Sequence, residues 1–116
     1  MSAKRDEGIA ALRRGDAGEA VRLLGEALKE QPQDTGSYAY LGAALGQLGR
    51  FGESAVAFYR ALQLQPNSAP LAFNLAQALE RAGRSEDAVE AYQRAVTLDP
   101  QHARAREGLQ RLEAGS

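Results

Sequence analysis

Most active sites are built from histidine, acidic and nucleophilic side chains. In this sequence, these residue types form no catalytic arrangement. The single histidine is His102, and Asp99 precedes it by three residues. Two potential ligands are too few for a metal site, and no nucleophile accompanies them. Because a lone histidine lacks the partners that a site requires, we expect His102 to be a surface or helix-capping residue.

Three acids lie near one another at Glu86, Asp87 and Glu90. They fall at the start of a predicted helix, where negative side chains stabilise the positive end of the helix dipole. A solvated helix start therefore explains them better than general-acid catalysis. The glycines form no phosphate-binding loop between a strand and a helix. The sequence thus predicts a protein that is not an enzyme and has no catalytic residue, cofactor or metal site.

Composition indicates one folded domain. The chain has 116 residues, of which 44% are hydrophobic and 25% are charged, which argues against disorder. The formal net charge is −1, and the arginine pairs near positions 13 and 105 are interspersed with acids, so no nucleic-acid partner is expected. No apolar run approaches the roughly 20 residues of a membrane span, and the N-terminus lacks the apolar core of a secretory signal. We expect a cytoplasmic protein with no membrane partner.

The sequence repeats itself with a period of 34 residues. Three kinds of residue recur in phase at this spacing: Pro32, Pro66 and Pro100; Gly15, Gly49 and Gly83; and Ala27, Ala61 and Ala95. Such a period is typical of stacked helical repeats. In each unit, glycine would end the first helix because it tolerates the left-handed conformation. Proline would stop the second helix because it lacks the amide donor.

The clearest unit runs from Ser37 to Pro66 and resembles the tetratricopeptide repeat family. That family has a tryptophan, a leucine–glycine pair and a tyrosine in the first helix, then alanine, phenylalanine and proline in or after the second. The middle repeat matches at Tyr38, Leu41, Gly42, Leu45, Ser54, Phe58, Ala61 and Pro66. The third matches at Ala72, Leu75, Ala76, Leu79, Ala88, Tyr92, Ala95 and Pro100. The first is looser and matches at Gly8, Ala20, Leu24, Ala27 and Pro32.

The resemblance covers Ser2 to His102 and implies an all-α fold. This fold is a right-handed superhelical solenoid of three helix-turn-helix repeats with a terminal capping helix. The repeats would occupy about 1–34, 35–68 and 69–102 of a single domain, and the capping helix about 103–114. From the apolar periodicity we expect helices over about 3–14, 18–30, 35–48, 52–64, 69–82 and 86–98. The last helix has a narrow apolar stripe and a polar remainder, as the end of a solenoid requires.

Two local features of these helices are also predicted. Asp34 and Ser85 are expected to be helix N-caps, because short polar side chains can accept hydrogen bonds from the first free amides. Leu48 and Val56 are expected among the large residues that fill the space left by small ones in the middle repeat.

Members of this family usually present a concave groove to a peptide or protein, lined by one face of each first helix. By that correspondence the partner-binding residues are Arg5, Ile9, Leu12, Arg13, Ala39, Tyr40, Ala43, Gln47, Phe73, Asn74, Gln77 and Arg81, with Arg104 and Arg111 from the capping helix. Tyr40 and Phe73 would be aromatic anchors among adaptable amides. Alternatively, both rings pack against neighbouring helices. We expect a partner segment with apolar anchors and, because arginines outnumber acids, a modest acidic bias.

One specificity of the family can be compared residue by residue. Members that grip the C-terminal carboxylate of large cytosolic chaperones use a lysine, two asparagines, a lysine and an arginine. The matching residues here are Arg5, Ile9, Tyr40, Pro70 and Asn74. Only Arg5 keeps the charge, so the sequence disfavours this co-chaperone role.

Two alternatives to a binding adaptor remain. One is self-association into a homo-oligomer, because Lys4, Glu7 and Gly8 replace apolar residues of the family pattern. This substitution would leave Val21, Leu24 and Leu28 under-covered. The other alternative, suggested by the three-repeat size, is a small chaperone for a secreted or assembled partner.

Overall fold

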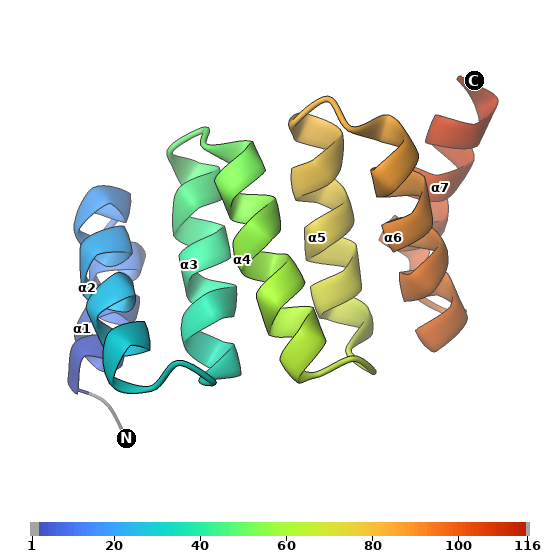
Figure 1. Ribbon diagram of the computed structural model, residues 1–116. Helices are drawn as coiled ribbons and strands as arrows, with labels where there is room; N and C mark the ends of the chain where they lie inside the picture. The colour runs from blue at the N-terminus through green and yellow to red at the C-terminus, as the bar shows by residue number, and fades with distance from the viewer. Residues whose placement is uncertain (1–2, 116) are drawn as a thin grey trace.

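The computed structural model describes residues 3–115, which fold into helices and connecting turns without a β-strand (Figure 1). The helices are α1 (Ala3–Arg13), α2 (Ala17–Glu30), α3 (Thr35–Gln47), α4 (Phe51–Leu64), α5 (Ala69–Arg81), α6 (Ser85–Leu98) and α7 (Ala103–Ala114). They form three helical hairpins followed by a single helix, as the 34-residue period predicts. The all-helical repeat architecture expected from the sequence is therefore confirmed.

Glycine makes the turn within each hairpin. Gly15, Gly49 and Gly83 have φ angles of 84°, 75° and 81°, in the left-handed region that favours glycine. The residue after each glycine donates its amide back into the helix, as Arg50 N does to the Leu45 carbonyl at 2.9 Å. The predicted role of these glycines is therefore confirmed.

Side-chain caps start the first helix of each following hairpin. The Asp34 carboxylate accepts a hydrogen bond from Gly36 N at 3.1 Å, and Ser68 Oγ accepts one from Leu71 N at 3.2 Å. One period further on, His102 Nδ1 accepts from Ala105 N at 3.2 Å at the start of α7. The predicted capping roles of Asp34 and His102 are both confirmed.

The prediction for Ser85 is wrong. The N-cap of α6 is Arg84, which makes no side-chain capping hydrogen bond, and Ser85 is already the first helical residue. The helix begins one residue early because the turn at Gly83 directs Arg84 N to the Leu79 carbonyl, while the Arg84 carbonyl accepts from Ala88 N. The Arg84 guanidinium instead pairs with Asp87 at 2.6 Å.

Within a hairpin, large side chains of the second helix pack against glycines of the first. A Cβ added at Gly8 would lie 2.8 Å from Leu24 Cγ, and one added at Gly42 would lie 2.8 Å from the Phe58 ring. Such contacts allow the helix axes to approach closely. They also bury Leu24 completely, so the prediction that Leu24 is under-covered is wrong.

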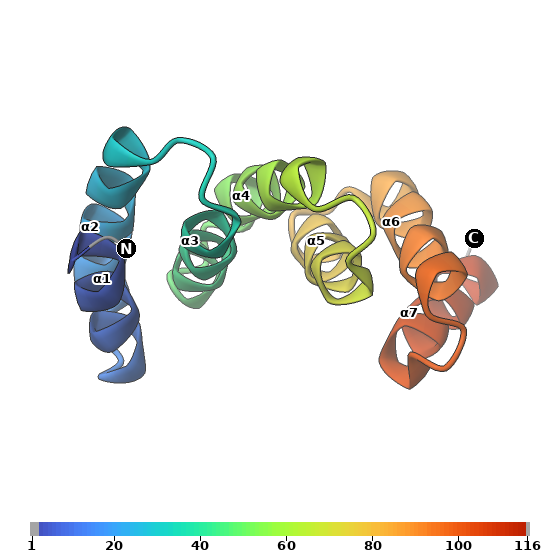
Figure 2. The ribbon, with the colours of Figure 1, turned by 90° about the horizontal axis from the view of Figure 1, so that it is seen from below.

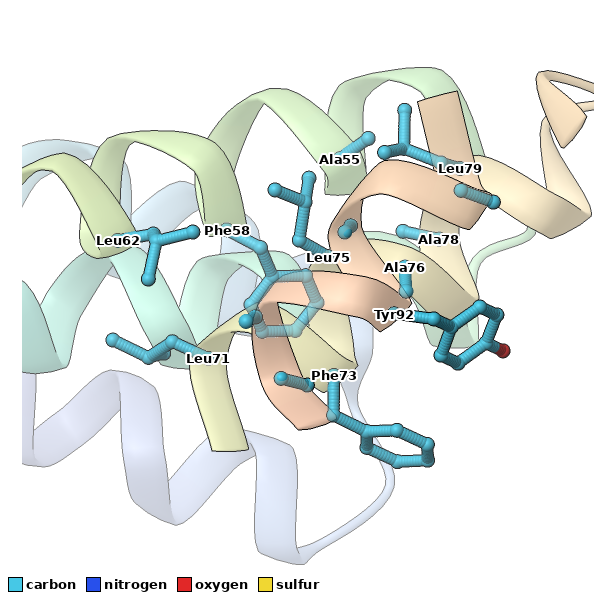
Figure 3. Packing of buried hydrophobic residues seen from close by; sticks show 14 of the residues in the cluster. Ala55, Phe58, Leu62, Leu71, Phe73, Leu75, Ala76, Ala78, Leu79 and Tyr92 are labelled. Carbon is cyan, nitrogen blue, oxygen red and sulfur yellow. The ribbon is translucent and has the colours of Figure 1, made fainter. Parts of the chain in front are cut away.

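The core consists of two clusters of buried apolar residues. The larger cluster spans α4 to α7 and includes Phe58, Leu62, Leu75 and Tyr92 (Figure 3). The smaller lies among α1, α2 and α3 around Leu24.

Two residues expected in the core are instead exposed. Leu48 is 44% exposed because it lies at the C-cap of α3, beyond the packed part of the helix. Val56 is 61% exposed, because the buried faces of α4 are formed by Ala55, Phe58 and Leu62.

Viewed nearly along its helices, the molecule is an arch (Figure 2). Helices α3, α5 and α7 lie along its inner side, and α4 and α6 lie along its outer side. The array measures 43 × 26 × 19 Å along its principal axes. The fold thus gives the chain a concave surface built from first helices and the terminal helix.

Candidate binding groove

A hollow of about 520 Å³ lies on the concave side between α3 and α5, and α4 forms its floor. We call it the α3–α5 hollow. It is lined by Ala39, Tyr40, Gly42, Ala43, Gly46, Gln47, Phe51, Ser54, Phe58, Asn74, Gln77, Ala78 and Arg81. Among the predicted binding residues, it brings together Ala39, Tyr40, Ala43, Gln47, Asn74, Gln77 and Arg81.

Helical periodicity and one buried hydrogen bond position the α3 side of the hollow. Tyr40, Ala43 and Gln47 follow one another at spacings of three and four residues, which places them on one face of α3. Behind them, buried Ser54 Oγ donates to the Gly42 carbonyl at 2.7 Å and fixes α4 against α3. Because Gly42 has no side chain, the Phe58 ring reaches the floor of the hollow.

A second hollow, of about 430 Å³, adjoins the first and is more strongly charged. We call it the α5–α7 hollow, and it is lined by Phe73, Gln77, Glu80, Arg81, Tyr92, Arg104, Glu107 and Arg111. Gln77 and Arg81 line both hollows, so the two are continuous along α5. Together they form what we call the binding groove.

A network of three side chains from three helices lines the α5–α7 hollow. Arg111 donates to both carboxylate oxygens of Glu80, at 2.6 and 2.7 Å, and the Tyr92 hydroxyl donates to Glu80 Oε1 at 2.8 Å. The hydrogen bond from Arg111 holds the pKa of Glu80 below its ordinary value of 4.5. Burial, followed by the bond to Glu80, raises the pKa of Tyr92 to about 12. At neutral pH the network therefore joins α5, α6 and α7 with a charged Glu80 and a neutral Tyr92.

Two further arginines of the groove lie over aromatic rings. The guanidinium carbon of Arg81 is 5.4 Å from the centroid of the Phe51 ring, and that of Arg104 is 4.8 Å from the centroid of the Phe73 ring. Such cation–π contacts hold the charge against an apolar surface without using its N–H donors.

Phe73 offers a ligand less accessible surface than the sequence suggests. Its side chain is 5% exposed, and its ring centroid lies 4.7 Å from that of His102 and 6.0 Å from that of Tyr92. Most of the ring is thus packed within the chain, although Phe73 still borders the α5–α7 hollow. Tyr40 is partly exposed and borders the α3–α5 hollow, so of the two expected anchors it offers the larger accessible surface.

The four expected residues of α1 do not join the groove. Arg5, Ile9, Leu12 and Arg13 line neither hollow. The Arg5 guanidinium instead pairs with Asp34 at 3.2 Å and so ties α1 to the N-cap of α3. The groove thus extends from α3 to α7 and excludes the first hairpin.

Several groove residues were missed by reasoning from first helices alone. Phe51, Ser54 and Phe58 belong to α4, and Tyr92 belongs to α6. The family pattern contains signals for Phe58 and Tyr92, but as packing residues. Phe51, the first residue of α4, has no such signal.

Residues 3–115 contain neither a metal site nor a membrane span. Nowhere in that range do three histidine or acidic side chains gather in a way that could hold a metal ion. No helix in the same range is both long and apolar enough to span a membrane.

Comparisons with known proteins agree with this geometry. Two family models, each described as tetratricopeptide repeat, match residues 5–69 and 45–112. No curated protein matches the chain in sequence. Among solved structures, MamA is 20% identical, with a TM-score of 0.92 over 97% of this chain and 66% of that chain. The first tetratricopeptide domain of Spaghetti (RPAP3), bound to the HSP90 peptide SRMEEVD, is 17% identical, with a TM-score of 0.89 over 97% of this chain and 89% of that chain.

A third similar structure belongs to a much longer protein. The mutant O-GlcNAc transferase of Thermobaculum terrenum is 28% identical, with a TM-score of 0.79 over 95% of this chain. The chain spans only 21% of that transferase, and 66% of MamA. These likenesses show a shared helical repeat fold.

Proposed function

The chain belongs to the tetratricopeptide repeat family, and from this premise we propose that it is a non-catalytic scaffold that holds a segment of a partner protein in the binding groove. Proteins of this family commonly serve as protein–protein interaction scaffolds. One structure with the same fold, the Spaghetti domain, holds a peptide. The proposal assigns this class of role to the groove between α3 and α7.

The observation that carries the proposal is the pair of continuous hollows on the concave side. Their volumes of about 520 and 430 Å³ are large enough for several side chains of a ligand. Their lining combines an accessible aromatic, Tyr40, with the amides of Gln47, Asn74 and Gln77. An aromatic anchor among adaptable polar groups is the composition expected of a binding hot spot and its surroundings.

The chemistry of the lining also indicates the partner. Apolar surface near Tyr40 and Phe58 suits an apolar side chain, and the arginines of the α5–α7 hollow favour acids. We propose a peptide segment with apolar anchors and a modest acidic bias. Family members that grip the C-terminal carboxylate of chaperones use an asparagine, a lysine and an arginine at the positions of Ile9, Pro70 and Asn74. We therefore do not assign the peptide of the Spaghetti domain to this chain.

Of the alternatives raised by the sequence, self-association loses its main support. That hypothesis required an under-covered apolar face on α2 formed by Val21, Leu24 and Leu28. Leu24 is fully buried beneath Gly8, whereas Val21 and Leu28 are half-buried. At the same end of the array, Lys4 of α1 forms an ion pair with Glu26 of α2 at 3.9 Å, and both side chains are partly exposed to solvent.

Substitutions on the two faces of the arch test the proposal. Peptides selected on the wild-type protein from a displayed random library serve as the probe, and affinity is measured by fluorescence anisotropy. We expect Tyr40→Ala and Asn74→Ala each to weaken binding by about 1–3 kcal/mol, as is typical near a hot spot. Circular dichroism and a thermal melt of each variant check that the fold persists.

Matched controls lie on the outer face of α4. Tyr59→Ala and Gln63→Ala remove an exposed aromatic and an exposed amide that line neither part of the groove. They should leave affinity unchanged. Tyr59 borders an outer hollow of about 610 Å³ between α4 and α6, so the opposite pattern would place the binding site there and refute the concave assignment.

A further inference from the structure

We propose that the α5–α7 hollow is a subsite for side-chain carboxylates of the partner segment and that Arg81 and Arg104 are its recognition residues. The inference rests on the proposed function and assigns the acidic part of the ligand to one place in the groove. Apolar anchors would then occupy the neighbouring α3–α5 hollow. The bound segment would consequently have a defined direction.

Two of the three arginines in the α5–α7 hollow keep their positive charge available to a ligand. Three arginines and two glutamates line the hollow. Arg111 is engaged by both oxygens of Glu80. By contrast, neither Arg81 nor Arg104 forms an ion pair within 4.0 Å with an acid of residues 3–115, and each lies over an aromatic ring; Arg81 interacts with Glu80 only at longer range. These two guanidinium groups therefore bring charge to the hollow that no acid of residues 3–115 offsets by direct pairing.

Aromatic rings hold the guanidinium groups of Arg81 and Arg104 in place. Arg104 lies over Phe73, which is itself fixed between His102 and Tyr92. Arg81 lies over Phe51 at the boundary of the two hollows. A ring face satisfies none of the five N–H donors of a guanidinium, so these donors remain available for an acceptor. Holding them against rings before a ligand arrives lowers the entropy cost of binding.

The charge of the α5–α7 hollow favours a carboxylate over other anions. Glu80 and Glu107 leave the hollow with one net positive charge, which suits a singly charged carboxylate better than a doubly charged phosphate. A guanidinium also matches a carboxylate through two parallel hydrogen bonds. Because Gln77 and Arg81 continue the surface into the α3–α5 hollow, a chain bound here can pass through. The subsite is therefore assigned to acidic side chains within a segment and not to a free C-terminus.

Selection from a displayed library tests the subsite. Random peptides fused at their C-terminal end present no free carboxyl terminus, so any enriched acid is a side chain. Wild-type protein should select peptides with Asp or Glu at a fixed separation from an apolar residue. The R81Q/R104Q variant should lose the preference for acids and keep the preference for the apolar residue. The matched R60Q/R106Q variant removes the same charge from two exposed arginines that do not line the groove, and it should select like the wild type.

A second measurement does not depend on how well a protein variant folds. In a peptide selected by the wild type, changing the enriched Glu to Gln should weaken binding to the wild-type protein by up to about fivefold, the range of a partly exposed ion pair. The same change should have no effect on R81Q/R104Q. Amidating the C-terminus of the synthetic peptide should also have no effect on the wild type.

Each outcome discriminates between the hypotheses. Acid preference that survives in R81Q/R104Q, or a Glu-to-Gln effect of equal size in both proteins, overturns the subsite and leaves the proposed function intact. A large effect of amidation would make the site a terminal-carboxylate site and also overturn the inference. If the wild-type protein selects no peptide at all, the proposed function fails and the subsite fails with it.

Discussion

At the scale of single residues, two glycines determine how closely large rings pack. A Cβ at Gly108 would lie 2.5 Å from Tyr92 Cζ, a distance that requires the ring or the helix to move. The hydrogen bond from the Tyr92 hydroxyl to Glu80 restrains the ring. Gly42 faces the Phe58 ring in the same way.

Gly108→Ala should therefore destabilise the protein by about 1–3 kcal/mol, the usual cost of overpacking, even though alanine favours a helix by about 1 kcal/mol. Urea unfolding measures the change. Gly25→Ala is the matched control, because a Cβ added there has no neighbour within 4 Å. Equal effects at the two positions would show that Tyr92 can move aside without cost.

Glu80 gives the stability of the protein a specific dependence on pH. Its pKa is lowered in the folded state, chiefly by the hydrogen bond from Arg111. Its stabilising effect is therefore fully present above the ordinary pKa of 4.5 and is lost as pH falls through the lower, folded-state pKa. We expect Glu80→Gln to be less stable than the wild type at pH 7 and the difference to shrink near pH 3.

Urea unfolding of both proteins at the two pH values measures this convergence. Comparing the two proteins removes the contributions of Glu19 and Glu53, whose pKa values are also lowered, by hydrogen bonds from Arg22 and Arg50. A difference that stays constant between pH 7 and pH 3 would contradict the assigned role of the carboxylate.

At the scale of helices, the 34-residue period was enough to predict the fold. It predicted the number of helices in residues 3–115 and their boundaries to within about one residue, because glycine and proline punctuate the chain at fixed positions. It failed for Ser85, Leu48 and Val56, since these depend on the exact turn geometry and on which face of α4 meets its neighbours.

The groove was predictable only in part, for a related physical reason. The family correspondence predicts Tyr40, Gln47, Asn74 and Gln77 as groove residues, and in the structure all four line the α3–α5 hollow. It does not reveal that two rings, those of Tyr92 and His102, pack against Phe73, or that Arg5 pairs with a helix cap. Those outcomes depend on contacts between repeats, which a pattern within one repeat does not contain.

Helix α7 should be required for stability as well as for the groove. It supplies the fully buried Ala105, the His102 cap precedes it, and Arg111 joins it to Glu80. Removing residues 101–116 would uncover Tyr92 and Phe73, so we expect a lower melting temperature and reduced solubility. Removing residues 113–116 is the control and should have little effect. An unchanged melting temperature in the longer truncation would show that α7 does not act as a cap.

At the scale of the whole molecule, stability should vary along the array. In repeat proteins it is approximately a sum of repeat and nearest-neighbour interface terms, so the ends open more readily than the middle. The buried residues of α1 are Gly8 and Ala11, whereas α5 buries eight residues. Hydrogen exchange followed by mass spectrometry should be fastest in α1 and slowest in α4 and α5. Uniform protection would indicate that a second copy of the chain covers the N-terminal end.

The sequential packing of the helices also has a mechanical consequence. Each helix packs chiefly on the helices next to it in sequence. Tension applied between the two ends is therefore carried chiefly by these interfaces in series. Additional ties join α1 to the N-cap of α3 through Arg5 and Asp34, and α7 to α5 through Arg111 and Glu80. We expect the array to behave as a soft spring that lengthens one hairpin at a time, beginning at its weakest interface. Without applied tension, the same softness of the array would let the curvature of the arch adjust to the length of the segment that it holds.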